Sequence, residues 1–111
     1  VDYQVADLFD TPDTWAGAFD FIFESRTIQS LPTDLAPQTI AAIAAFTAPD
    51  GRIFIICNAR DNNTPAHGIP WSLARADLAH FETNGLVQQS LEEFRTGWHH
   101  FRAVYQRPEA E

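Results

Sequence analysis

The sequence has one cysteine, no methionine, no lysine and no long apolar run. The lone thiol of Cys57 cannot form an internal disulfide, which excludes a disulfide-stapled secreted scaffold. Neither a signal-peptide pattern nor the roughly 20 apolar residues that cross a bilayer is present, so we expect a cytoplasmic protein without a membrane partner. Because the first residue is Val1 and already reads as part of a strand, we also expect a piece of a longer chain.

Basic side chains are scarce. The 111 residues carry 15 acidic and 7 basic side chains, for a formal net charge of -8. All the basic residues are arginines, and no two of them are adjacent. A nucleic-acid groove needs clustered positive charge against the phosphates, so a nucleic-acid partner is excluded. The 45% hydrophobic content is enough for a buried core and argues against disorder.

Apolar runs and turn residues predict strands that alternate with helices. Strands are expected at residues 1–9, 18–23, 52–57, 86–94 and 101–107. One helix is expected to be capped by Thr33 or Asp34 and to end before the turn at residues 49–51. A second helix is predicted at residues 75–83, with Leu78 and Phe81 facing inward.

This order predicts one α/β domain over residues 1–111. Buried strands alternating with helices indicate a mostly parallel sheet with right-handed crossovers. The last two strands are joined by a short link that contains Gly97, so a C-terminal antiparallel hairpin is expected at one edge.

Three segments in this order carry a family resemblance: residues 5–9 (VADLF), 18–25 (AFDFIFES) and 48–56 (APDGRIFII). They resemble class I S-adenosylmethionine-dependent methyltransferases, most closely bacterial enzymes related to thiopurine methyltransferases. The resemblance implies a partial Rossmann-like sheet and S-adenosylmethionine as the cofactor. It also implies methyl transfer to the sulfur, oxygen or nitrogen of a small-molecule acceptor.

The chain departs from the family at its most diagnostic element, a glycine-rich turn after the first strand. No Gly-x-Gly occurs here, and the acidic residue that ends the family's second strand is also missing. The resemblance therefore runs from the third strand to the C-terminus, and the fragment alone is expected to be inactive. In the family's strand order, 3-2-1-4-5-7-6, the strand at 18–23 would have an open edge. We expect self-association there, or pairing with the missing N-terminal half.

The resemblance places cofactor contacts at the ends of two strands. Asp7 matches the position whose carboxylate accepts from the adenine amino group, and Leu8 or Phe9 would wall the ring. Glu24 and Ser25 would line the cleft between cofactor and acceptor. The alternative for Asp7 is that it caps the short turn at residues 11–15.

Two residues are candidates for a catalytic role. Glu24 would orient or deprotonate the acceptor, and the planar guanidinium of Arg26 would clamp an anionic group of it. Methyl transfer is an in-line displacement that depends mainly on alignment, so no base is required. The alternatives are an ion pair, or a glutamate beside a helix N-terminus.

The loop at residues 58–71 would cover the same cleft, with Arg60, His67 and Trp71 as candidate substrate contacts. An ordinary surface loop whose Trp71 packs on the core is the alternative. Trp15 is expected in the core.

The cysteine and the histidines lack metal-ligand spacing, so no metal site is predicted. Cys57 lies in a buried strand and reads as an inert thiol. The main rival to an enzyme is a non-catalytic α/β interaction module that completes its sheet with a partner chain. Another nucleotide-binding α/β domain fits the architecture but offers no phosphate loop.

Overall fold

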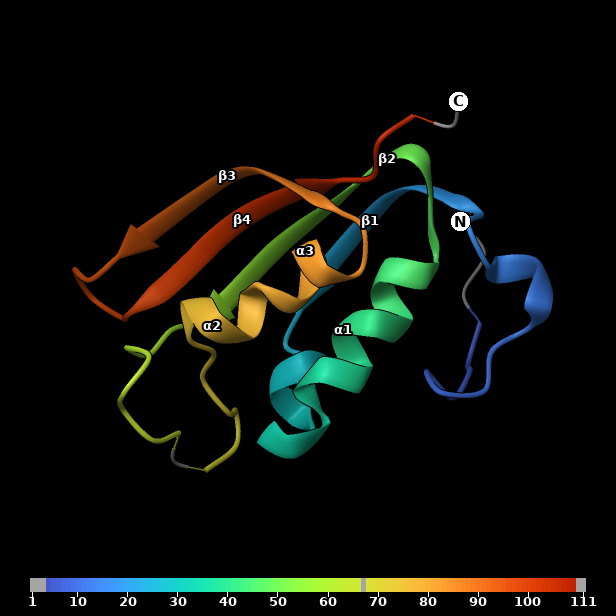
Figure 1. Ribbon diagram of the computed structural model, residues 1–111. Coiled ribbons are helices and arrows are strands. Elements are labelled where there is room, and N and C mark those ends of the chain that lie inside the picture. Colours follow the sequence, from blue (N-terminus) through green and yellow to red (C-terminus); the bar gives the residue numbers. More distant parts are fainter. Residues whose placement is uncertain (1–3, 67, 110–111) are drawn as a thin grey trace.

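A computed structural model describes residues 4–66 and 68–109 as a four-stranded open sheet with its α-helices on one face (Figure 1). The strands are β1 (Phe19–Ser25), β2 (Thr47–Asn58), β3 (Val87–Phe94) and β4 (His100–Gln106). The α-helices are α1 (Ala36–Ala45), α2 (Arg75–Leu78) and α3 (His80–Thr83), and short 3-10 turns are η1 (Asp13–Trp15), η2 (Ile28–Ser30) and η3 (Thr33–Leu35).

The sheet order is β1-β2-β4-β3. β1 and β2 are parallel, whereas β4 runs antiparallel to both β2 and β3. The prediction of a mostly parallel sheet is therefore wrong: the sheet is mixed. The antiparallel pairing of the last two strands is as expected. However, the chain returns from β3 into the gap beside β2, so the final strand forms two antiparallel ladders instead of one.

Strand β2 begins at Thr47, upstream of the predicted start at Arg52. Residues 49–51, which were predicted to form a turn before the strand, instead form an irregular stretch within it. The register with β1 shifts there, Asp50 has φ 65°, and a Cβ on Gly51 would lie 2.8 Å from the Ala48 carbonyl oxygen. Turn-forming residues thus produce a bulge here, because the flanking Thr47 and Arg52 pair with β1, and the backbone groups of Asp50 and Gly51 bond to Arg107.

The strand expected at residues 1–9 is not found in the part of it that the structure describes. Residues 1–3 lie outside the described ranges, and residues 4–6 have no regular structure. Asp7 and Asp10 close a turn, with the Asp10 N–H 3.0 Å from the Asp7 carbonyl oxygen. The side chain of Val5 is fully exposed. Alternation alone does not make a strand, because an extended segment needs a neighbour for its backbone groups.

The helices follow the apolar pattern but not the expected ends. Neither Thr33 nor Asp34 caps α1, because η3 leads directly into it. The helix predicted at residues 75–83 is divided at Ala79 into α2 and α3. Leu78 and Phe81 are nonetheless buried, which confirms their predicted orientation.

The core fills the space between the α-helices and one face of the sheet, which we call the covered face. Phe81 stacks on Tyr105 with ring centroids 4.9 Å apart. The other large buried side chains are Ile28, Ile40, Ile53, Ile55, Leu73, Leu78 and Phe101. Trp15 lies outside this core, in a partly exposed cluster with Phe19 and Phe46.

The opposite face has no α-helix on it within the described ranges (Figure 1). We call this surface the bare face; the residues on it include Phe21, Phe23, Phe54, Ile56, Ser90, Glu92, Arg102 and Val104. None of the helices that the structure describes is long and apolar enough to cross a membrane.

Candidate functional site

A hollow of about 470 Å³ lies near the carboxyl end of β1. One wall is the N-terminal turn, with Asp7, Leu8 and Phe9. The other wall is the segment after β1, with Thr27, Ser30 and Leu31. Ligands of α/β sheets bind outside the carboxyl ends of parallel strands, and the hollow is in such a position. The tertiary structure thus brings together three predicted cofactor residues with a segment about 20 residues further along the chain.

Asp7 presents a carboxylate at this hollow. Its Oδ1 accepts the backbone N–H of Phe9 at 3.0 Å, so it closes its own turn and does not cap residues 11–15. The second carboxylate oxygen has no partner among the described residues. An exposed carboxylate oxygen beside the apolar groups of Leu8 and Leu31 suits a ligand with an amino group on a flat apolar ring.

Glu24 and Ser25 do not line this hollow. Side chains alternate along β1, so Phe21 and Phe23 reach the bare face, whereas Glu24 turns to the covered face and is only 3% exposed. Ser25 is exposed at the end of the strand. The predicted cofactor residues are therefore divided between the hollow and the end of β1.

The Glu24 carboxylate caps the turn that follows the strand. Its Oε1 accepts backbone N–H groups from Thr27 at 2.7 Å and from Ile28 at 3.3 Å. Its Oε2 is buried and has no partner in the described parts of the chain. Burial raises the pKa of Glu24, and the hydrogen bonds from Thr27 and Ile28 oppose this shift. Of the roles considered for Glu24, the geometry is that of a glutamate at the start of a helical turn.

Arg26 is exposed and has a left-handed backbone conformation with φ 73°. Its carbonyl oxygen accepts both the N–H and the hydroxyl of Ser30, at 3.0 and 2.6 Å. Within the described ranges its guanidinium forms no ion pair, with Glu24 or with any other acid. Arg26 therefore shapes the hollow through its backbone, and its side chain is available to solvent or a ligand.

The loop after β2 is anchored at its base rather than loose. Arg60 donates to the carbonyl oxygens of Ser72 and Thr64, at 3.0 and 2.9 Å, and pairs with Asp77 at 3.0 Å. These three bonds commit its guanidinium to holding the loop. His67 lies outside the described residues. Trp71 is half-buried, and its backbone N–H donates to the Gln29 backbone carbonyl oxygen at 2.8 Å.

Gln29 is a structural residue that the sequence analysis missed. It is 1% exposed, and its Oε1 accepts the backbone N–H of Asn58 at 3.1 Å. With the bond to Trp71, Gln29 ties the segment after β1 to both ends of the loop after β2. Its Nε2 is buried without a partner in the described structure. No local pattern reveals this role, because both bonds join segments that are distant in sequence.

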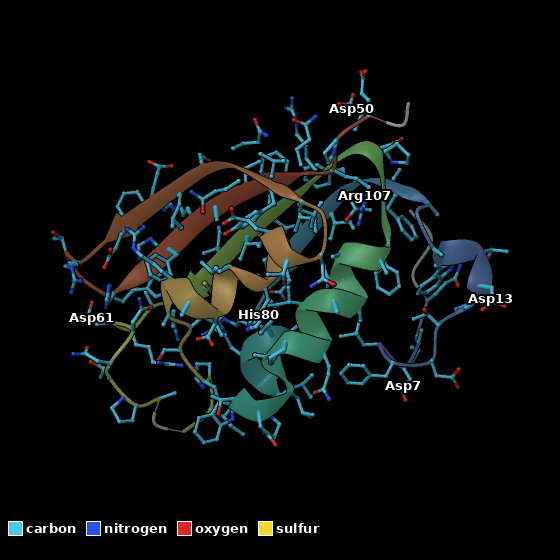
Figure 2. All side chains as sticks on the ribbon, in the orientation of Figure 1. Asp7, Asp13, Asp50, Asp61, His80 and Arg107 are labelled. Carbon is cyan, nitrogen blue, oxygen red and sulfur yellow. The ribbon has the colours of Figure 1, made fainter. Side chains whose placement is uncertain are left out.

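Asp61, Glu93 and His99 place possible metal-ligand atoms within 4.8 Å of one another. Arg95 already pairs with both carboxylates at 2.8 Å, and His99 Nε2 lies 2.6 Å from Glu93. The hydrogen bond from His99, followed by that from Arg75, lowers the pKa of Glu93. The guanidinium thus supplies the positive charge that these acids would otherwise take from a cation. Figure 2 shows Asp61 far from Asp7, so this cluster is separate from the hollow.

Cys57 is buried in β2, as expected. Burial raises the pKa of its thiol to about 12, with a smaller contribution from the negative charge of Glu24. The thiol therefore stays protonated at neutral pH and is a poor nucleophile.

No family model and no curated protein matches the chain. Solved structures with the same fold include 1,6-didemethyltoxoflavin N1-methyltransferase from Burkholderia thailandensis, with bound S-adenosylhomocysteine. It is 15% identical over 94% of this chain and 49% of that protein, with a TM-score of 0.70. A TehB-like S-adenosylmethionine-dependent methyltransferase from Corynebacterium glutamicum is 22% identical over 94% of this chain and 55% of that protein, with a TM-score of 0.68.

The [4+2]-cyclase SpnF is also similar, at 12% identity over 98% of this chain and 56% of that protein, with a TM-score of 0.77. The chain thus has an S-adenosylmethionine-dependent methyltransferase-like α/β fold, and it spans about half the length of these proteins. The fold alone does not define the reaction, since one fold hosts several chemistries.

Proposed function

We propose that the chain is the C-terminal part of an S-adenosylmethionine-dependent methyltransferase domain that acts on a small molecule. The sheet order β1-β2-β4-β3 supports this proposal, because it equals the order 4-5-7-6 that the family resemblance implies. In this assignment β1 corresponds to the family's fourth strand. The proposal includes a cytoplasmic location for the domain. The thiopurine-methyltransferase-like subtype remains part of the proposal.

The observation that carries the proposal is the hollow between Asp7 and Leu31. Asp7 would accept a hydrogen bond from the adenine amino group, and Leu8, Phe9 and Leu31 would enclose the ring. These residues fit the adenosyl part of the cofactor only. A contact for its methionine part would have to come from outside the chain, because the sequence has no glycine-rich turn.

The cofactor, held through its adenosyl part by Asp7, Leu8, Phe9 and Leu31, would supply a methyl group activated by a sulfonium for transfer to an acceptor heteroatom, with S-adenosylhomocysteine as the leaving group. The chain would contribute to this reaction mainly by alignment. Arg26, the first residue after β1, would bind an anionic group of the acceptor. Trp71 would close the cleft from the side of the loop, fixed there by its backbone bond to Gln29. A base role for Glu24 would require its unpaired Oε2 to become accessible.

Nuclear magnetic resonance titration with S-adenosylhomocysteine and adenosine tests the adenosyl site. We expect saturable shifts at Leu8, Phe9 and Leu31, with a Kd of about the millimolar range for this half-site alone. Asp7→Asn should weaken binding severalfold. The matched control is Asp10→Asn, an acid of the same turn that does not line the hollow. Shifts that avoid the hollow, or equal binding by both variants, would contradict the proposal.

A further inference from the structure

The turn that follows β1 has one side in the hollow beside Asp7, which we call the adenosyl hollow, and the other side in the core. It contains the 3-10 turn η2, in which side chains three residues apart share a face. Thr27 and Ser30 are exposed and line the adenosyl hollow. Ile28 and Gln29 are buried. A single turn of backbone therefore separates the hollow from the core.

Hydrogen bonds hold this turn together as one body. Ser30 donates its backbone N–H and its hydroxyl to the Arg26 carbonyl oxygen, at 3.0 and 2.6 Å. The buried Glu24 carboxylate accepts the Thr27 N–H at 2.7 Å. A bonded network of this kind stiffens the segment that carries it. A displacement on the hollow side of the turn therefore also displaces Gln29 on the core side.

Gln29 connects the core side of the turn to the base of the loop after β2. Its Oε1 accepts the Asn58 N–H at 3.1 Å, and its backbone carbonyl oxygen accepts the Trp71 N–H at 2.8 Å. The Asn58 carbonyl oxygen in turn accepts the Leu73 N–H at 2.9 Å. The two ends of the loop thus meet at one residue, which is 1% exposed.

We propose that Gln29 is a positioning residue that couples the adenosyl hollow to Trp71, the candidate acceptor contact in the loop. A ligand that presses on Leu31 moves the whole turn. Gln29 passes that movement to Asn58 and Trp71. The coupling is reciprocal, so a change in the loop also changes the affinity of the hollow for its ligand. This inference rests on the proposed function.

Other side chains hold the loop at places that do not touch the hollow. Arg60 pairs with Asp77 of α2 at 3.0 Å. Asn62 Oδ1 accepts the backbone N–H of Ala76, also in α2, at 3.0 Å. Neither bond involves a residue that lines the adenosyl hollow. Asn62→Ala loosens the loop without cutting the link to the turn, and it is therefore the matched control.

The first part of the test needs no ligand. It measures amide hydrogen exchange by nuclear magnetic resonance in the complete 111-residue chain. Gln29→Leu should speed the exchange of the Trp71 and Ser30 amides about tenfold or more, relative to the Tyr105 amide in the core of the sheet. Neither amide bonds to the Gln29 side chain, so a purely local loss would leave both rates unchanged. Asn62→Ala should not change them, and Gln29→Glu, which keeps an acceptor oxygen, should restore them.

The second part titrates the parent chain with adenosine. We expect saturable shifts of the Asn58 and Leu73 amides with the same midpoint as those of Leu31. Leu73 is 2% exposed and does not line the hollow, so its shift has to be transmitted. In Gln29→Leu the Leu31 amide should still shift, whereas the Leu73 shift should be lost.

Two results would overturn the inference. One is exchange of the Trp71 and Ser30 amides that is the same in Gln29→Leu and Asn62→Ala. The other is a set of adenosine shifts confined to residues that line the hollow, and this result decides if Gln29→Leu does not fold. Failure of the proposed function looks different: adenosine would then shift no amide of the hollow, and the exchange rates alone would decide whether Gln29 links the turn to the loop.

Discussion

The two faces of the sheet differ although their strands are shared. The covered face carries Ile53, Ile55, Phe101 and Tyr105, each at most 1% exposed, beneath α1 and α3. The bare face carries equally apolar rings on alternate positions of the same strands, yet Phe21 and Phe23 remain more than half exposed. Hydrophobicity therefore does not distinguish the faces. The difference is that the described residues supply a layer of helices for one face only. Side chains on the covered face therefore stabilise the fold by packing, whereas those on the bare face contribute little.

The largest expected effect is the loss of a ring from the covered face. Phe81→Ala should lower the free energy of unfolding by about 3–5 kcal/mol, because it leaves a cavity against Tyr105. Urea unfolding followed by circular dichroism measures the change. A loss below about 1 kcal/mol would mean that the covered face is loosely packed.

The next effect concerns the clamp that holds the helix layer to the sheet. Arg107 donates to the carbonyl oxygens of Thr47 and Ala44, at 3.0 and 2.7 Å, and thereby caps the end of α1. Arg107→Gln should destabilise the chain by about 1–3 kcal/mol, since it leaves these carbonyls without a charged donor. The same unfolding assay measures it, with the exposed Arg52→Gln as the control that should change little.

A pH-dependent effect comes from Glu24, the one carboxylate among the described residues that is buried on the covered face. Burial raises its pKa above the ordinary 4.5, so the folded chain keeps the proton to higher pH than the unfolded chain does. Its contribution to the free energy of unfolding is therefore full below about the unfolded pKa and is lost as the pH rises through the folded pKa.

Glu24→Gln removes this titration, so stability should fall less steeply with pH above 4.5 than in the parent. Urea unfolding at a series of pH values measures the slope. An unchanged slope in Glu24→Gln would contradict the account of this buried carboxylate.

The smallest effect is expected on the bare face. Phe23→Ala should cost below about 1 kcal/mol in the chain alone, because its ring is 57% exposed and leaves no enclosed cavity. If Phe23→Ala proved as destabilising as Phe81→Ala, the bare face would be covered in solution, and the contrast between the faces would not hold.

Local pattern was a good guide to which side chains face the core. The last strand, expected at residues 101–107, alternates as a half-buried strand does, with Phe101, Ala103 and Tyr105 buried and Arg102 exposed. The second helical segment likewise turns Leu78 and Phe81 inward. Element ends were less predictable: residues 49–51 have turn chemistry but lie within β2, because the residues that flank them pair with β1 and their own backbone groups bond to Arg107.

The candidate site was predictable only in part. The resemblance placed Asp7, Leu8 and Phe9 together, and the structure sets them against Thr27 and Leu31 in one hollow. That Glu24 caps a turn instead of facing this hollow depends on which face of β1 the helices cover. Alternation along β1 alone predicts the opposite, because Phe19, Phe21 and Phe23 form its more apolar set, whereas Glu24 shares its side with Asp20 and Ile22.

By itself the sequence determined the apolar periodicity, the acidic charge and the resemblance to methyltransferases, because these properties depend on the identity and spacing of residues. Only the tertiary structure decided the mixed sheet, the bulge in β2 and the exposure of one face. It also decided the bonds from Arg107 to Ala44 and from Gln29 to Asn58. These features depend on contacts between segments far apart in the chain, where each backbone group takes the partner that the fold brings within reach.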